Sequence, residues 1–265
     1  MGVIQYEQQA GVARVTISFP ARFNAMSRIM WRELRSVFES VQNNTEVRCV
    51  VIGGEGGNFC SGGDISQYAD FRFQESTLRD FHENDVWGGL KAMLACDVPI
   101  VAKIDGNCMG AGVEIASCCD IRLAGVGARF GAPIARLGFP MAPREAALVA
   151  REVGLVMARQ MLLEASIFSA TDMKASGFLS RVTADDQLGA EAQATALRIA
   201  GLAPQAARLN KKTLRALISP LALANISSDA MNSEAIEYSD AYAYADCIEH
   251  REGVQAFLEK RKPAF

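Results

Sequence analysis

Apolar, β-branched runs alternate with helical patterns through the first half of the chain, and no other feature constrains the fold as strongly. The runs "VARVTIS" at 12–18 and "VRCVVIGG" at 47–54 are typical of strands that end in turns. Between them, Ser27 can cap a helix with one apolar face, formed by Leu34, Val37, Phe38 and Val41. A strand, a helix and a second strand in this order predict a crossover packed on a sheet.

The same pattern continues with the apolar runs "VPIVAKIDG" at 98–106 and "CDIRLAG" at 119–125, on either side of a predicted helix at 110–117. Strands buried on both faces of a parallel sheet have this uninterrupted apolar character. The first half of the chain therefore predicts an α/β fold built on a largely parallel sheet.

Helical patterns dominate the second half. A capping box is predicted at Ser169 and Asp172. Further helices are predicted at 187–202, 204–217 and 249–262. These last helices are amphipathic and have no predicted sheet to cover, so we expect them to pack on the core or on another subunit.

Composition excludes several classes of protein. The 265 residues carry a net charge of −3 without a basic run, which argues against a nucleic-acid partner. No apolar stretch approaches the ~20 residues that span a bilayer, and the N-terminus lacks a signal-peptide pattern. The seven cysteines are odd in number and form no C-x-x-C pair, as expected for free thiols in a reducing compartment. We therefore expect a soluble cytoplasmic protein.

Metal and hydrolase sites find little support in the sequence. His82 and His250 are the only histidines, so a histidine-rich zinc site is not expected, and no metal is predicted. The segment "NFCSGGD" lacks the first glycine of the G-x-S-x-G motif, which argues against a serine hydrolase.

Two glycine-bearing loops stand where a predicted strand hands over to a helix, "GGEGGNFCSGGDI" at 53–65 and "DGNCMGAGVEI" at 105–115. Glycine lets the backbone approach a ligand closely and turn its N–H groups outward. The loops could aim two N–H donors at one oxygen, or they could be tight turns only. A dinucleotide fingerprint fails on spacing, because Ile115 stands where a third glycine is needed. Glu114 follows the second loop within an apolar run, and a buried charge is costly unless it is used.

The motifs "NFCSGGDI", "VPIVAKIDGNCMGAGVEIASCCDIRLAG", "ARFGAP", "SATDMKASGFLSRV" and "REGVQAFLEKRKPAF" follow one another along nearly the whole chain. In this order they resemble the crotonase (enoyl-CoA hydratase/isomerase) superfamily. The resemblance implies a spiral of ββα units at 1–195, a helical trimerisation region at 196–265, and a homotrimer or homohexamer. It also implies a coenzyme A thioester as substrate, with no permanently bound cofactor.

Carried over by position, the resemblance places two oxyanion-hole donors on the backbone N–H groups of Gly63 and Ala111. Such donors stabilise the enolate that develops on a thioester oxygen, typically by ~3 kcal/mol each. It also makes Glu114 the first of the two catalytic glutamates of the hydratases. Burial raises the pKa of a carboxyl group, which suits one that exchanges protons near neutral pH.

The second catalytic glutamate should directly follow the proline of "FGAPIARLG", and Ile134 stands there instead. Three alternatives stay open. Glu114 acts alone in hydration or dehydration, Glu145 from "PMAPREAA" supplies a second carboxylate, or the chain runs another reaction of the superfamily. That last group comprises isomerisation, decarboxylation and thioester hydrolysis, with non-catalytic acyl-CoA binding beside them.

Substrate contacts are predicted mainly in the first loop. The resemblance implies that its backbone holds coenzyme A at Cys60, Ser61, Gly62, Asp64 and Ile65, with Arg22 near the phosphates. Ile134 is predicted to contact the substrate, and Leu137, Phe139 and Met141 to line the acyl pocket.

Two structural roles are also predicted. Asp64 is expected to cap the following helix. Asp120 and Arg122 are expected to pair with each other across a buried strand.

Overall fold

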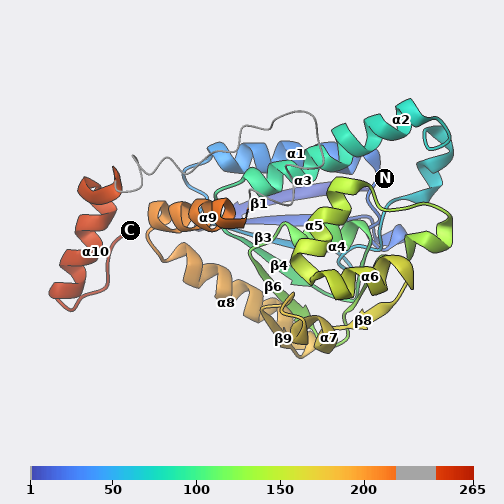
Figure 1. Ribbon diagram of the computed structural model, residues 1–265. Helices are drawn as coiled ribbons and strands as arrows, with labels where there is room; N and C mark the ends of the chain where they lie inside the picture. Colours follow the sequence, from blue (N-terminus) through green and yellow to red (C-terminus); the bar gives the residue numbers. More distant parts are fainter. Residues whose placement is uncertain (1, 219–242) are drawn as a thin grey trace.

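A six-stranded sheet forms the centre of the computed structural model, which describes residues 2–218 and 243–265 (Figure 1). Its strand order is β1-β2-β3-β4-β6-β9, and all neighbours are parallel except β1 and β2. The strands are β1 (Val3–Gln9), β2 (Val12–Ser18), β3 (Cys49–Gly54), β4 (Ile100–Ile104), β6 (Ile121–Gly125) and β9 (Arg181–Thr183). The predicted α/β class and the largely parallel sheet are thus confirmed.

Helices cover both faces of this sheet, with α1 (Arg28–Asn43) and α3 (Trp87–Ala95) on one face and α8 (Leu188–Ala200) on the other (Figure 1). On α1, Leu34 and Phe38 are fully buried in the main core, as the predicted apolar face requires. On α8, Leu188, Ala192 and Ala196 pack against sheet residues in a second, smaller core. Burial on both faces explains the continuous apolar character of the inner strands.

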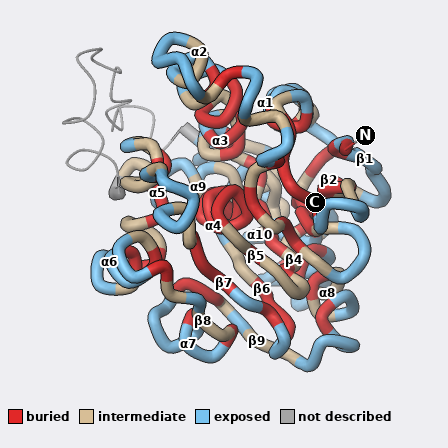
Figure 2. The backbone as a smooth tube through the Cα atoms, turned by 90° about the vertical axis from the view of Figure 1, so that its right-hand side faces the viewer, coloured by how far each residue is buried: buried red, intermediate tan, exposed pale blue. Residues whose placement is uncertain are grey.

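A second, three-stranded sheet lies beside the first and is formed by β5 (Asn107–Met109), β7 (Arg129–Gly131) and β8 (Ile167–Ser169). The chain passes from β4 through β5 into α4 (Ala111–Ser117), and from β6 through β7 to α5 (Pro143–Val153). Each passage is a ββα unit, as the resemblance implies. All residues of α4 are buried, and Figure 2 shows this helix near the centre of the molecule.

The remaining α-helices lie outside this core, and the last of them stands apart from the sheets at the left of Figure 1. They are α2 (Glu75–Asp80), α6 (Leu155–Leu163), α7 (Ala170–Ala175), α9 (Pro204–Ile218) and α10 (Ile248–Leu258). The capping box at Ser169 and Asp172 is present at the start of α7. In the described ranges, 2–218 and 243–265, no helix is long and apolar enough to cross a membrane.

Several details differ from the sequence-based expectations. The edge strand β1 was not predicted, because only Ile4 of its residues is buried and the apolar pattern is weak. The predicted strand 98–106 divides at Asp105 and Gly106, where the chain leaves one sheet for the other. Helix α8 does cover a sheet, so a domain boundary after residue 195 would cut a single packed helix. The division into two regions stays a prediction.

The predicted pairing of Asp120 with Arg122 is wrong. Arg122 instead pairs with Glu152 of α5 at 2.9 Å, and Asp120 pairs with Lys211 of α9 at 2.8 Å. Neighbours two apart on a strand share a face, but these two side chains find opposite charges on different helices.

Candidate active site

The two glycine-bearing loops lie against each other. The N–H of Cys60 donates to the carbonyl of Asn107 at 2.9 Å, and the Cys60 carbonyl accepts from the N–H of Met109 at 2.8 Å. A Cβ on Gly112 would lie only 2.7 Å from the Cys60 carbonyl oxygen, so the first turn of α4 packs directly on the first loop. Loop-to-loop contact of this kind needs glycine.

Each predicted donor follows a glycine with a left-handed backbone. Gly62, before Gly63, has φ +121°, and Gly110, before Ala111, has φ +49°. A Cβ on Gly110 would lie 3.6 Å from the Cα of Gly62, so the two turns adjoin. Among the described residues, no hydrogen bond uses the N–H of Gly63 or of Ala111. Ala111 begins α4, where an N–H has no partner within the helix.

Glu114 lies in the first turn of α4 and is 8% exposed. Burial, and then the nearby charge of Glu145, raises the pKa of the Glu114 carboxyl well above its ordinary value. The raised pKa favours the protonated form of this carboxyl group, which lies one helical turn after Ala111 and can act as a proton donor.

Glu145 lies in the first turn of α5 and is 2% exposed. Its Oε1 is 3.2 Å from Nδ1 of His82, whose Nε2 is 3.4 Å from Nη2 of Arg72. A guanidinium can only donate, so His82 accepts at Nε2 and carries its proton on Nδ1. His82 therefore donates to Glu145.

His82 belongs to η3 (Phe81–Val86), a π-helix between α2 and α3. Insertions of this kind re-aim side chains and are frequent at functional sites. Asp85 of η3 is 3% exposed and accepts from both Arg28 and Arg32 of α1, each at 2.6 Å. Two charged hydrogen bonds to one buried carboxylate hold this turn in place.

The start of α5 is also joined to η3. Arg144 pairs with Glu83 at 2.9 Å and lies over the ring of Trp87. The elements that carry His82 and Glu145 are thus linked by a second contact besides the hydrogen bond between them.

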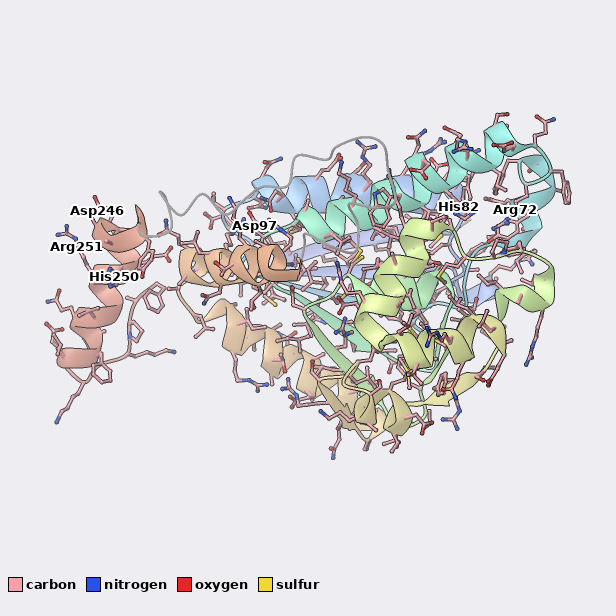
Figure 3. All side chains as sticks on the ribbon, viewed as in Figure 1. Arg72, His82, Asp97, Asp246, His250 and Arg251 are labelled. Atoms are coloured by element: carbon pink, nitrogen blue, oxygen red, sulfur yellow. The ribbon has the colours of Figure 1, made fainter. Side chains whose placement is uncertain are left out.

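An aromatic cluster closes the same side of the site. The hydroxyl of Tyr68 lies where a Cβ of Gly63 would be, and burial raises the pKa of this hydroxyl, which stays protonated. The guanidinium of Arg72 lies against the rings of Tyr68 and Phe139, at 4.3 and 3.7 Å from their centroids. Figure 3 shows Arg72 and His82 on the side of the molecule opposite His250 of α10.

The other predicted contacts are distributed around the first loop. Ser61 Oγ donates to the carbonyl of the exposed Arg22 at 2.9 Å, and Ile65 is 52% exposed. Asp64 accepts from the N–H and hydroxyl of Ser66, so its predicted role as a cap of the following turn is confirmed. The buried Cys60 thiol has a pKa raised to about 12 and is unreactive.

Ile134 belongs to the short helix η4 (Pro133–Leu137), and is half-buried against the main core. Leu137 is 52% exposed, whereas Met141 is buried.

A sequence model described as enoyl-CoA hydratase/isomerase matches residues 7–265. The chain belongs to the enoyl-CoA hydratase/isomerase family. A protein of Mycobacterium bovis named probable enoyl-CoA hydratase is 30% identical over 264 residues, covering 99% of this chain and 96% of that protein. The short-chain-enoyl-CoA hydratase of Clostridium acetobutylicum is 29% identical, with coverage of 97% and 94%.

The fold agrees with this membership. A crystal structure from Magnetospirillum magneticum, described as an enoyl-CoA hydratase/carnithine racemase, superposes with a TM-score of 0.91. It is 34% identical, and the match covers 100% of this chain and 96% of that one. The predicted superfamily and fold class are thereby confirmed.

Tyr68, Arg72 and His82 were not predicted as site residues. They lie in the aromatic-rich segment 66–95, which has no regular periodicity because 3-10, α- and π-helical turns follow one another there. The one sequence signal that could have pointed to these site residues was a histidine within the aromatic-rich segment.

Proposed function

We propose that this chain is an enoyl-CoA hydratase-like enzyme that adds water to an α,β-unsaturated acyl-CoA or removes it from a 3-hydroxyacyl-CoA. The observation that carries this proposal is the meeting of two unused backbone N–H groups, at Gly63 and Ala111, with two buried carboxyl groups. Family membership supports the same reaction class and a coenzyme A thioester as the substrate.

In the forward direction, the N–H groups of Gly63 and Ala111 donate hydrogen bonds to the thioester oxygen and stabilise the negative charge that develops on it. A water molecule attacks Cβ of the substrate while Glu145 takes one of its protons. Glu114 gives its proton to Cα, which completes the addition across the double bond. Transfer of a proton from Glu145 to Glu114 then restores the starting state.

The division of roles rests on the surroundings of the two carboxyl groups. The raised pKa of Glu114 keeps it protonated and able to act as an acid. Glu145 receives a hydrogen bond from His82 and is suited to act as the base. Carboxyl pairs whose environments separate their proton affinities commonly divide the acid and base roles in this way.

This proposal assigns to Glu145 the role of the second catalytic carboxylate, because Ile134 stands where the family resemblance predicts a glutamate. Glu145 comes from the first turn of α5, where the helix dipole favours a negative charge. The assignment of Glu145 as the second carboxylate is supported by its charge, which contributes to the raised pKa of Glu114 and requires that the two groups be close. An enzyme that relies on Glu114 alone would have no need of a second buried carboxylate at this place.

The binding of coenzyme A is proposed at the first loop. Ser61, Gly62 and Ile65 would contact it, with Arg22 on the adjoining turn near its phosphates. The hydrogen bond between Ser61 and Arg22 supports this arrangement, since it brings both to one exposed edge. Asp64 and Cys60 would contribute through their backbone, because the Asp64 carboxylate is used as a cap.

The test is hydration of crotonyl-CoA, measured as loss of absorbance of the conjugated thioester and as ¹⁸O incorporation from labelled water into the product. We expect turnover by the native chain, and loss of turnover with retained binding in Glu114→Gln. Binding of acyl-CoA without turnover across a panel of thioesters would contradict the proposal and favour the non-catalytic alternative.

We also propose a homotrimer or homohexamer in a reducing compartment such as the cytoplasm. Apolar side chains on α10 are open to solvent in the single chain, with Ile248 85%, Phe257 83% and Leu258 73% exposed. All seven cysteines are free thiols. Sedimentation analysis tests the assembly, and a purely monomeric protein would contradict it.

A further inference from the structure

Arg72 differs from three other partly buried arginines in what it contacts. Arg28, Arg122 and Arg144 each have a carboxylate oxygen within 2.9 Å. No carboxylate of the described residues pairs with Arg72. Its Nε is buried and has no hydrogen-bond partner there. A buried donor without a partner is costly, which calls for a group that satisfies it.

The geometry around Arg72 leaves its hydrogen-bonding edge available. The rings of Tyr68 and Phe139, whose centroids are 5.9 Å apart and whose planes are inclined by 69°, lie on two adjoining sides of the guanidinium. The contact with His82 uses one of the five N–H groups, at Nη2, and the Tyr68 hydroxyl is a second hydrogen-bond neighbour of the guanidinium. An arginine packed against aromatic rings in this way presents its remaining N–H groups as a fork that matches a carboxylate.

Arg72 also lies close to the reacting centre. Tyr68 connects it to the first loop, because the Tyr68 hydroxyl lies against Gly63 while its ring contacts Arg72. On its other side, His82 connects it to Glu145. A group bound by Arg72 would therefore be attached to the acyl part of the substrate, a short distance from the thioester carbonyl.

Charge balance favours an anion at this position. Burial raises the pKa of the Glu114 carboxyl, which disfavours its charged form. Glu145 lies on the far side of the His82 ring and is occupied by the hydrogen bond from Nδ1. The positive charge of Arg72 therefore lacks a direct counter-ion among the described residues.

We propose that Arg72 binds a carboxylate carried by the acyl group, so that the preferred substrate is a short enoyl-CoA with a second, free carboxylate. This inference rests on the proposed function and names its substrate class. Arg72 therefore has two roles. Recognition of the carboxylate depends on the acyl group, whereas the hydrogen bond to His82 does not.

The experiment compares glutaconyl-CoA with crotonyl-CoA, since the two differ by one terminal carboxylate. Affinity and kcat/KM are measured for the native chain, Arg72→Met and Arg72→Lys. We expect Arg72→Met to lower the glutaconyl-to-crotonyl ratio of each quantity by roughly ten- to a hundredfold, as for a lost charge-assisted hydrogen bond. Arg72→Lys should recover part of this ratio. Effects that pass through His82 are common to both substrates and cancel in the ratio.

Arg79→Met is the matched control, because Arg79 is 69% exposed on α2 and pairs with Glu75. It removes the same charge and should leave the ratio unchanged. The N-acetylcysteamine thioesters of the same acyl groups distinguish the source of the anion. If Arg72 holds a phosphate of coenzyme A instead, Arg72→Met weakens both CoA thioesters equally and neither cysteamine thioester.

An unchanged ratio in Arg72→Met would overturn the proposal. Failure of the proposed function is distinguishable, because a chain without hydratase activity would still bind glutaconyl-CoA more tightly than crotonyl-CoA if Arg72 recognises the carboxylate.

Discussion

The surroundings of Glu114 and Glu145 differ although the two carboxyl groups influence each other. Glu114 lies in a helix whose seven residues are all buried, and no side chain among the described residues donates to its carboxyl group. Glu145 lies at the start of a helix and accepts from His82. The comparison teaches that one residue type can hold a proton at one position and release it at another, because the environment decides which form is stable.

The largest effect is expected when Glu145 is changed. Glu145→Gln removes the proposed base without changing the size of the side chain, so kcat for hydration should fall by about 10²- to 10⁴-fold. Steady-state assays with crotonyl-CoA measure this, while binding of the substrate should change little.

Glu152→Gln is the matched control for this prediction, since Glu152 is also in α5 and pairs with Arg122 and Arg151. It should leave kcat nearly unchanged. The double variant Glu114→Gln/Glu145→Gln should be no slower than the slower single variant, because groups that act as a unit are not additive. Multiplicative losses would contradict a shared role.

His82 should have a smaller effect with a distinct pH signature. His82→Phe removes the hydrogen bond to Glu145, so kcat/KM should fall about tenfold, less than the roughly 10²- to 10⁴-fold typical of a group that transfers the proton itself. The loss should be greatest at the acid end of the pH profile, where the carboxylate is most easily protonated. His82→Gln can still donate and should restore part of the activity.

The matched control for this variant is His250→Gln, because His250 in α10 is the other histidine of the chain. Its pH profile should equal that of the native chain. A uniform loss at every pH in His82→Phe would indicate a purely structural role for His82.

The pH dependence of the stability of the fold should also reveal the environment of Glu114. The pKa of Glu114 is raised in the folded state above its ordinary value of 4.5, so the native chain loses stability as pH rises through the folded pKa. In Glu114→Gln the side chain is neutral at every pH, so this variant does not lose stability in this way. Its melting temperature should equal that of the native chain below pH 4.5 and exceed it increasingly at higher pH, by roughly 2–4 °C per kcal/mol.

Thermal unfolding between pH 4 and 8 measures this difference. Glu39→Gln serves as the control, because Glu39 is a surface residue that pairs with Arg35 on α1. Its difference from the native chain should stay small across this range. A Glu114→Gln variant less stable than the native chain at pH 8 would contradict the burial of an unpaired carboxyl group.

Much of the fold and part of the site could be predicted from sequence because the signals were local. The glycine loops at strand ends and Glu114 in the helix after them are local features, whereas the roles of Gly63, Ala111 and Glu114 come from the family resemblance and stay predictions. Such local features can be recognised from a few consecutive residues. The family has the same short motifs in the same order along the chain.

The rest of the site depends on tertiary contacts between distant segments. Glu145 stands 31 residues after Glu114, and nothing in "PMAPREAA" shows that α5 turns its first carboxylate toward α4. His82 comes from a π-helix whose altered periodicity hides the direction of its side chains. Arg122 shows the same limit, because its partner Glu152 could not be chosen over the nearby Asp120 without the packing of α5.

The smallest effect is expected at Ile134. It distinguishes a site that lacks a second glutamate from one in which Glu145 supplies it from another position. Ile134→Glu restores the residue that the family resemblance leads one to expect at this position. If Glu145 already supplies the second carboxylate, the new side chain adds no needed group, and kcat for crotonyl-CoA should not rise. In the Glu145→Gln background, however, Ile134→Glu should recover part of the lost activity, because a carboxylate is again available to take a proton from water. A large gain in the otherwise native chain would mean that Glu114 works alone there, and that Glu145 is not the base.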